Sequence, residues 1–353
     1  MSALAGPDAR ALVADPIEAS TIYSRGYYGT LSSDGLGLDR YEAVYLSETG
    51  RVELVDERGR PVAWPALFRK ATRAEDGFGI RYVVYRDLRQ RGYVVRSSPP
   101  PVSFSVLPRG GVLHKTPSKF WVDAQSERTP FDLARLFELA ERAQGAKKSL
   151  LLALVDEESD LTYYRVRRPW PKGSQPVRRL SPPAVGWLSG DRVVVFEREA
   201  ADALGRTQSY GSRIGDRLEL SLIEAEHLRS TGQLELRDAR TGRVVTEARF
   251  RQRARRLEAG FSERLSAYRT LRDRALVVKT GFKYGAHFRA YPRDPEHAHA
   301  RYLVQAVPSS HRAPWPEIAG AVRVAQGVRK EFLLASVAED APVRFLSLER
   351  IRP

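Results

Sequence analysis

Residues 210–240 read YGSRIGDRLELSLIEAEHLRSTGQLELRDAR, and residues 28–58 read YGTLSSDGLGLDRYEAVYLSETGRVELVDER, at a constant spacing of 182 residues. The two stretches share a Tyr-Gly, a Glu-Ala, a Thr-Gly and a Glu-Leu pair in the same order. A repeat this long holds a whole domain, whereas solenoid repeats span only about 20–45 residues. The sequence therefore predicts a tandem duplication of two globular units.

Two further blocks extend the repeat toward the end of each half. The block Tyr85–Arg89 corresponds to Tyr268–Arg272, and residues 143–148 correspond to residues 325–330. Between the halves, prolines and a glycine around Trp170 predict a stiff, irregular linker. We expect five segments: an N-terminal subdomain 1–77, a second subdomain 78–168, a linker 169–186, an N-terminal subdomain 187–256 and a second subdomain 257–353.

The residue pattern of each half predicts a mixed α+β and α/β fold. Short alternating runs such as Leu218–Leu220, followed by Thr-Gly turns, indicate a small sheet around a helix near Glu224–Ser230. The helical spacing of Phe261, Leu265 and Tyr268 indicates a helix that opens the second subdomain. Each half is therefore expected to pair a small α/β subdomain with a second α/β subdomain.

A second helix and an apolar strand complete each second subdomain. In the first half, we expect Thr129 to cap this helix and Pro130 to be its first residue. In the second half, Trp315 is expected to open the equivalent helix. The apolar runs Leu150–Val155 and Phe332–Val337 that follow are typical of buried central strands, which predicts a central mixed sheet.

The composition favours a nucleic-acid partner. Lysine and arginine number 58 against 43 acidic residues, which gives a net charge of +15, and arginine grips phosphates and stacks on bases. A merely solvated basic surface is the alternative. The absence of cysteine excludes disulfides, thiolate zinc sites and cysteine nucleophiles. With no signal peptide and no apolar run of membrane-spanning length, the expected location is the cytoplasm.

Residues 279–299 mix lysine, tyrosine and histidine side chains with glycines, which suits a polyanion site with acid/base chemistry. The first half offers an internal comparison for this stretch. Tyr291 aligns with Leu107, and His299 aligns with Pro117. Because the phenol and the imidazole occur only in the second half, we expect that half to be catalytic and the first half to be its degenerate copy.

Several blocks of the second half resemble the archaeal tRNA-splicing endonuclease family in its two-unit, homodimeric form. The blocks are residues 268–272, 278–285, 288–291, 299–304 and 322–330. The resemblance implies a nuclease-like second subdomain with Tyr291, His299 and Lys330 as catalytic residues, and neither a metal nor a cofactor. It implies excision of introns from precursor tRNA at a bulge-helix-bulge, leaving a 2′,3′-cyclic phosphate and a 5′-hydroxyl.

The resemblance also implies roles outside the catalytic residues. Arg323 and Arg344 correspond to arginines that hold a flipped base by stacking. The residues expected to contact the RNA or to shape the site are Lys279, Lys283 and His287. In the family, an acidic loop of the non-catalytic unit docks on the partner subunit, which gives that role to Asp156, Glu157 and Asp160.

The residue types suit this reaction by themselves. Tyr291 is the candidate base, although an unperturbed phenol has a pKa of about 10, so a nearby ammonium such as Lys330 must favour its ionised form. Histidine is the residue type that most readily exchanges a proton under physiological conditions, which makes His299 the candidate acid, and Lys330 can neutralise phosphate charge. The roles of Tyr291 and His299 could be exchanged. His297 offers a competing imidazole that, on a strand, would share a face with His299.

Two other functions remain open at this stage. A metal-dependent nuclease could use His297, His299 and His311 with Asp294 or Glu296 as ligands. A structured-RNA-binding protein without catalysis would make the histidines structural.

Overall fold

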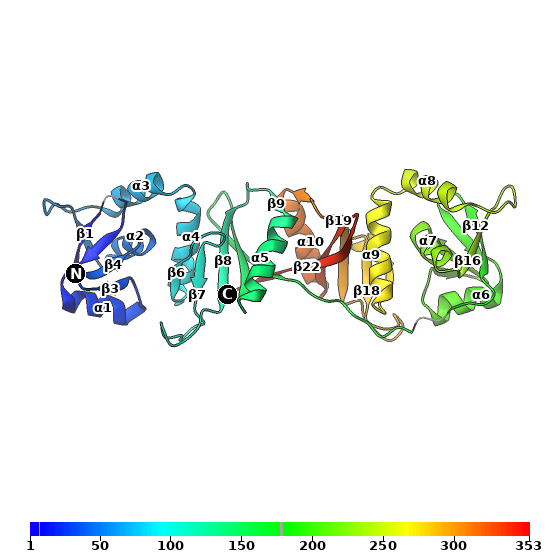
Figure 1. The fold of residues 1–353 in the computed structure, drawn as a ribbon, viewed down its shortest axis with the longest axis horizontal. Helices are drawn as coiled ribbons and strands as arrows, with labels where there is room; N and C mark the ends of the chain where they lie inside the picture. The colour runs from blue at the N-terminus through cyan, green and yellow to red at the C-terminus, as the bar shows by residue number, and fades with distance from the viewer. Residues whose placement is uncertain (7, 177–178) are drawn as a thin grey trace. The chain divides into compact units, whose positions relative to one another are not determined.

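The computed structural model describes residues 1–6, 8–176 and 179–353, so residues 177 and 178 of the predicted linker lie outside the described residues. The chain divides into two compact units. The first comprises residues 1–129, 138–166 and 351–353, and the second comprises residues 130–137 and 167–350. Each unit contains a five-stranded N-terminal sheet with its helices and a second set of five strands with helices of its own (Figure 1).

The N-terminal sheet of the first unit has five strands. Their order is β3 (Thr30–Ser32), β4 (Gly35–Leu38), β2 (Ala11–Val13), β1 (Ser2–Ala5) and β5 (Glu53–Val55). Strands β1 and β5 pair in parallel, and the other neighbours are antiparallel. The accompanying helices are α1 (Pro16–Gly26), α2 (Arg40–Glu48) and α3 (Trp64–Ala74).

The second unit repeats this arrangement strand for strand. The order is β14 (Ser212–Ile214), β15 (Arg217–Ser221), β13 (Arg192–Val195), β12 (Ala184–Ser189) and β16 (Leu234–Asp238), again with one parallel pair. Its helices are α6 (Arg198–Asp202), which continues as a π-helix (Ala203–Thr207), α7 (Leu222–Ser230) and α8 (Glu247–Leu257). The identical strand order confirms the predicted duplication.

The second sheet of each unit also repeats. In the first unit its order is β6 (Val95–Ser97), β7 (Phe104–Val106), β8 (Phe120–Ser126), β10 (Ser149–Val155) and β11 (Leu161–Arg167), and the helices are α4 (Phe78–Gln90) and, from residue 138 onward, α5 (Leu133–Gly145). In the second unit it is β17 (Val277–Thr280), β18 (Phe288–Tyr291), β19 (Tyr302–Pro308), β21 (Glu331–Ala338) and β22 (Ala341–Ile351), with α9 (Phe261–Asp273) and α10 (Trp315–Gly327). The predicted mixed α/β fold is thus confirmed.

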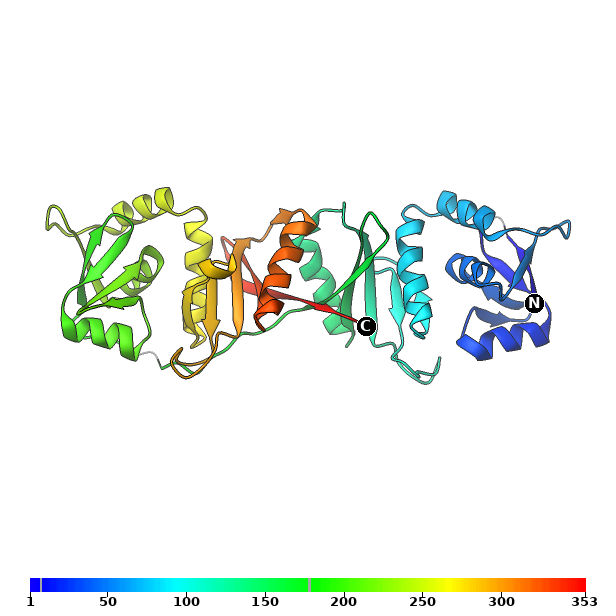
Figure 2. The same cartoon turned by 180° about the vertical axis from the view of Figure 1, so that it is seen from behind.

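Helices α9 and α10 lie on opposite faces of the second sheet of the second unit (Figure 2). Alternate strand residues, among them Val278, Ala290 and Val304, join the core under α9. The side chains between them point to the other face, because successive strand residues alternate. Tyr291 is one of these, and it forms a separate small cluster with Val277 and Ala300.

The expected start of α5 is wrong by three residues. Phe131 and Asp132, which belong to the second unit, form the short strand β9, and this strand pairs with β20 (Arg312–Ala313) of the same unit. Phe131 is fully buried there, and its ring packs edge-on against Trp315 at 5.2 Å. The carboxylate of Asp132 accepts the Arg135 N–H at 3.0 Å. This pairing keeps the residues after Pro130 extended, so Asp132 caps the helix instead of Thr129.

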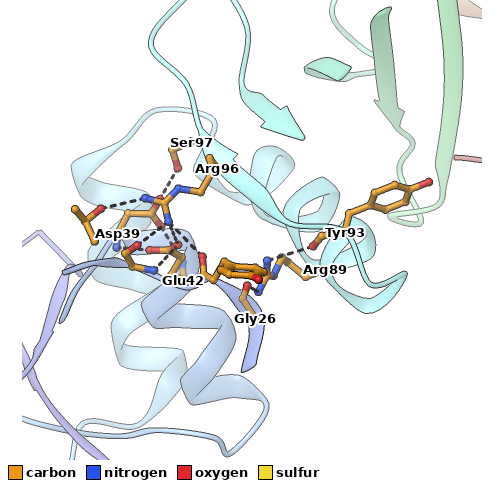
Figure 3. A network of polar contacts seen from close by, with 10 residues as sticks. Gly26, Asp39, Glu42, Arg89, Tyr93, Arg96 and Ser97 are labelled. Atoms are coloured by element: carbon orange, nitrogen blue, oxygen red, sulfur yellow. Dashed lines mark hydrogen bonds and ion pairs between the residues drawn. The ribbon is translucent and has the colours of Figure 1, made fainter. Parts of the chain in front are cut away.

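The repeated Tyr-Gly motif binds the N-terminal subdomain to the second subdomain in each unit. Arg89 on α4 places its guanidinium 3.7 Å from the centre of the Tyr28 ring and donates to the Gly26 carbonyl at 2.8 Å (Figure 3). In the second unit, Arg272 on α9 stands 4.0 Å from the centre of the Tyr210 ring. The tyrosine of the motif therefore covers a buried cation in both copies.

The glycine of the motif donates its N–H to a buried carboxylate. Glu224 and Ser221 form a capping box at the start of α7, and Glu224 also accepts the Gly211 N–H at 2.8 Å. Gly211 has a positive φ of 53°, and a Cβ there would lie 2.4 Å from the Glu219 carbonyl oxygen. Glu42 makes the equivalent bond to Gly29 in the first unit (Figure 3).

Among the described residues, none of the helices is long and apolar enough to cross a membrane.

Candidate active site

Tyr291 ends strand β18, with only 8% of its surface exposed. Its neighbours Val277 and Ala300 form a small apolar cluster with it. The Arg289 guanidinium stands 5.9 Å from the centre of the Tyr291 ring. The ring is therefore fixed by packing, in the position that Leu107 takes in the first unit.

The register of three strands gathers the candidate residues at one end of the sheet. The Arg301 N–H donates to the Ala290 carbonyl at 3.0 Å, and the Glu331 N–H donates to the Arg301 carbonyl at 2.9 Å. Tyr291 follows Ala290 and Lys330 precedes Glu331, so both flank this hydrogen-bonded row. The three β strands thus bring together residues that lie 39 positions apart in the chain.

Lys330 has different surroundings from its counterpart Lys148. The Lys148 ammonium donates to the Ser118 carbonyl at 2.6 Å. Among the described residues, the Lys330 ammonium donates to the nearby Val328 carbonyl at 3.2 Å, and it stands 5.6 Å from the centre of the Tyr284 ring. The same residue type is therefore bound to the backbone at the neighbouring strand in the first unit and faces an aromatic side chain in the second.

His299 and His297 lie in the loop between β18 and β19, and both are exposed. Strand β19 begins only at Tyr302, so the two imidazoles do not share a strand face. His299 stands two residues before Arg301, next to Ala300, which contacts Tyr291 in the small cluster. The His297 N–H donates to the Asp294 carbonyl at 3.0 Å and belongs to a separate turn.

A segment of the linker holds the backbone beside Tyr291, which the sequence did not indicate. The Ser174 N–H donates to the Pro292 carbonyl at 2.7 Å, and the Gln175 N–H donates to the Ala275 carbonyl at 2.9 Å. A Cβ on Gly173 would lie 2.1 Å from the Ala275 carbonyl oxygen. A glycine in a proline-rich stretch was the only sequence signal, and it did not reveal the partner.

Lys279 in the second unit and Arg96 in the first both donate to the carbonyl of the motif glycine. The Lys279 ammonium donates to the Gly211 carbonyl at 2.7 Å, and an Arg96 N–H donates to the Gly29 carbonyl at 2.8 Å. Burial lowers the pKa of Lys279. This side chain joins the two subdomains, as its counterpart does.

His287 also has a counterpart in the first unit. Its Nδ1 accepts the Ala306 N–H at 3.1 Å, and its Nε2 lies 3.3 Å from the Gln305 side-chain nitrogen. In the first unit, the Ser103 hydroxyl accepts the Ala124 N–H at 3.1 Å. Both side chains satisfy an N–H of the neighbouring strand, which is a shaping role.

The comparison with known proteins follows the same duplicated pattern. Residues 78–163 and 261–345 match the tRNA intron endonuclease catalytic C-terminal domain, and residues 7–68 and 184–251 match the tRNA intron endonuclease N-terminal domain. The chain belongs to the tRNA intron endonuclease family. Each domain of this endonuclease family occurs twice, so the predicted resemblance to it is confirmed and the chain is an enzyme of this family.

Full-length relatives support the same conclusion. The chain is similar to the tRNA-splicing endonuclease of Methanosarcina mazei, with 37% identity over 335 residues that cover 94% of both chains. It is 36% identical to that of Methanococcoides burtonii over 336 residues, and 34% identical to that of Halobacterium salinarum over 348 residues. These alignments also cover 94% of both chains.

The other cations expected to contact RNA lie on different elements of the endonuclease. Arg323 is exposed on α10, which ends at Gly327 and so does not extend to Lys330. Lys283 is exposed on the turn before β18. The exposed Arg344 on β22 places its guanidinium 4.5 Å from the centre of the Phe137 ring.

The acidic stretch forms the exposed hairpin turn between β10 and β11. Asp156 folds back on this turn, because its carboxylate accepts the N–H groups of Glu158 and Asp160 at 3.0 and 2.8 Å. Glu157 forms an ion pair with Arg128 at 2.8 Å. Asp160 and Glu158 remain exposed at the tip.

The histidines considered as metal ligands do not converge. Across residues 1–6, 8–176 and 179–353, no group of three or more histidine and acidic side chains is placed to hold a metal ion. His311 lies 6.2 Å from the Phe131 ring, between centroids, at the pairing of β20 with β9.

The half-buried imidazole of His287 is expected to make the fold sensitive to acid. Burial, with the Arg264 guanidinium adding to it, lowers the pKa of His287 to about 4. The unfolded chain takes up this proton near pH 6.5, so the stabilisation is present above that pH and is lost as the pH falls toward 4. Replacing His287 by asparagine, whose Oδ1 can accept the Ala306 N–H without titrating, is expected to reduce the loss.

The measurement is the thermal midpoint of the wild type and of His287→Asn between pH 7.5 and 4.5. The difference between the two midpoints should shift in favour of the variant as the pH falls. A difference that is independent of pH would show that His287 is protonated equally in the folded and unfolded chains.

Proposed function

We propose that the chain excises introns from precursor tRNA by cutting each strand of a bulge-helix-bulge, without a metal ion. The single observation that carries the proposal is the strand register at the end of β18, β19 and β21, where Tyr291 and Lys330 flank one row of hydrogen bonds and His299 stands in the loop that leads into β19. The first unit has leucine and proline in place of the phenol and the imidazole. The second unit is therefore the proposed catalytic one.

The proposed reaction needs three groups. The ribose 2′-oxygen attacks the phosphorus while a base removes its proton, and the bond from phosphorus to the 5′-oxygen breaks while an acid protonates the leaving oxygen. Tyr291 and His299 supply the base and the acid, and either order satisfies the proton balance. Lys330 offsets the charge on the pentavalent phosphate. No water enters, so the products are a 2′,3′-cyclic phosphate and a 5′-hydroxyl.

The RNA contacts follow from exposure. Arg323, Arg344 and Lys283 are exposed cations of the second unit, and we assign them to RNA, the arginines to stacking on a displaced base. Lys279 and His287 are engaged with the backbone of their own unit. We assign these two to shaping the site.

Cleavage of a precursor tRNA in excess EDTA tests the proposal. We expect cleavage at both bulges, 5′ ends that a polynucleotide kinase labels directly, and 3′ ends that resist ligation until the cyclic phosphate is opened and the resulting phosphate is removed. A requirement for added Mg²⁺ or Mn²⁺, or products with 5′-phosphates, would instead favour the metal-dependent nuclease. Tight binding without any cleavage would favour the RNA-binding protein.

We further propose that two copies assemble through the acidic turn. Its exposed carboxylates fit a basic partner surface, and the chain carries a net charge of +15. Neutralising it with Asp156→Asn, Glu157→Gln and Asp160→Asn is expected to convert a dimer to a monomer in light scattering. The asparagine at position 156 can still accept the N–H groups of the turn.

The equivalent turn of the second unit supplies the control. Glu339→Gln with Asp340→Asn removes two exposed carboxylates between β21 and β22 and should leave the dimer intact. If both sets of changes affect the molecular mass equally, or neither does, the acidic turn between β10 and β11 has no special part in assembly.

A further inference from the structure

Phe282 is the most exposed large hydrophobic side chain among the described residues, with 86% of its surface accessible. Trp170 is 73% exposed, but the Arg274 guanidinium covers its ring at 3.5 Å from the centre. No aromatic ring or cation of the described chain stacks on Phe282 in this way. A single exposed phenyl is common on protein surfaces, so a function has to be argued from further features.

The backbone holds Phe282 in place. Phe282–Tyr284 form a 3₁₀ turn closed by two hydrogen bonds, from the Tyr284 N–H to the Gly281 carbonyl at 2.8 Å and from the Gly285 N–H to the Phe282 carbonyl at 3.0 Å. The Gly281 N–H donates to the His287 carbonyl at 3.0 Å, which closes the loop at its base. A ligand that stacks on this ring would therefore meet a largely ordered loop.

Glycines make this turn possible. A Cβ on Gly281 would lie 2.7 Å from the Ala286 carbonyl oxygen, and Gly285 has a positive φ of 65°. The outward position of Phe282 is thus set by the tight fold of its loop.

The surroundings of Phe282 suit a nucleotide. Lys283 is the next residue and is exposed. The ring centre of Tyr284, in the same turn, is 5.6 Å from the Lys330 ammonium. An exposed aromatic ring next to an exposed lysine of the same turn matches a base and its phosphate, since bases stack on aromatic faces and phosphates attract cations. The turn that carries Phe282 therefore borders the candidate active site through Tyr284.

The first unit lacks these features. The corresponding residues 97–103 carry three prolines and neither an aromatic nor a lysine side chain. Like the phenol of Tyr291, the exposed ring is found only in the second unit.

We propose that Phe282 is a stacking platform for an unpaired nucleobase of the RNA substrate, with Lys283 contacting the adjoining phosphate. The proposal rests on the RNA substrate of the proposed function, but not on the assignment of acid and base. It adds a second base-binding position to the one proposed for Arg323 and Arg344. Because stacking needs only an aromatic face, Phe282→Tyr and Phe282→Trp are expected to keep it, and Phe282→Ala to lose it.

Binding to bulged and fully paired RNA tests this platform. The bulged RNA carries 2′-deoxyriboses at the cut positions, so that attack by the 2′-oxygen cannot occur, and 2-aminopurine in the bulge reports stacking. Phe282→Ala should weaken binding of the bulged RNA about 5- to 100-fold and reduce the 2-aminopurine quenching, with duplex binding unchanged. Phe196→Ala, which removes a phenyl that is 60% exposed in the N-terminal subdomain, should change neither.

Several outcomes would overturn the platform. Unchanged binding by Phe282→Ala, equal losses on bulged and duplex RNA, or an equal loss with Phe196→Ala would each exclude it. A change in molecular mass of Phe282→Ala in light scattering would assign the ring to a protein contact instead. Cleavage of the 2′-deoxy RNA would contradict the proposed reaction without affecting the stacking result.

Discussion

Replacing Tyr291 by phenylalanine is expected to slow cleavage about 100- to 10,000-fold, the contribution of a positioned acid or base. The ring is 8% exposed and packs in the cluster with Val277 and Ala300, and phenylalanine keeps that packing. Only the hydroxyl is lost, so the fold and the affinity for precursor tRNA should stay near those of the wild type. Single-turnover cleavage with enzyme in excess measures the chemical step, and RNA binding is measured separately.

A neighbouring tyrosine provides the control. Tyr302 begins β19 and is 5% exposed, and Tyr302→Phe removes the same hydroxyl from the core under α9. This variant should cleave like the wild type. His299→Ala changes an exposed loop residue, and its cleavage rate should be reduced as strongly as that of Tyr291→Phe. Cleavage by Tyr291→Phe at the wild-type rate would remove the phenol from the mechanism, and an equal loss in Tyr302→Phe would indicate a structural effect.

Much of the fold could be predicted from the sequence because the chain contains its own comparison. Constant spacing of the Tyr-Gly and Glu-Ala pairs required the two units to share a fold, and their sheets have identical strand orders. The physical reason for the motif became clear only from the structure. Its tyrosine covers Arg272, which lies far away in the chain, and its glycine donates to the buried Glu224 of the same repeated stretch.

The same comparison shows where sequence reasoning stops. Alignment of His287 with the proline-rich loop suggested a residue special to the second unit. In the structure, the imidazole accepts the strand N–H that a serine hydroxyl accepts in the first unit. Two different side chains can satisfy one buried N–H, so a difference in residue type need not be a difference in role.

Contacts between distant segments were the other limit. Ser174 and Pro292 are 118 positions apart, and their hydrogen bond joins main-chain groups that every sequence offers. The predicted start of α5 was wrong for a similar reason. Thr129 and Pro130 have the residue types of a helix start, but the pairing of β9 with β20 and the burial of Phe131 outweigh this local preference.

Removing the Lys330 ammonium is expected to cause the second large loss of cleavage. Its counterpart Lys148 provides the control. Lys330→Ala removes an ammonium that, within the described part of the chain, is hydrogen-bonded to the Val328 carbonyl two residues away, so little stability should be lost. Cleavage should fall about 100- to 1,000-fold, as when a charge-stabilising donor is removed from an active site. Lys148→Ala removes the bond to Ser118 and should lower the free energy of unfolding by about 1 kcal/mol.

Cleavage by Lys148→Ala should match the wild type, because its ammonium is bound to the backbone of the unit that lacks the phenol and the imidazole. Single-turnover cleavage and thermal unfolding of both variants separate the two effects. A loss of cleavage in Lys148→Ala as large as that in Lys330→Ala would mean that both lysines support the fold. It would then leave Tyr291 and His299 as the only chemistry that distinguishes the second unit from its copy.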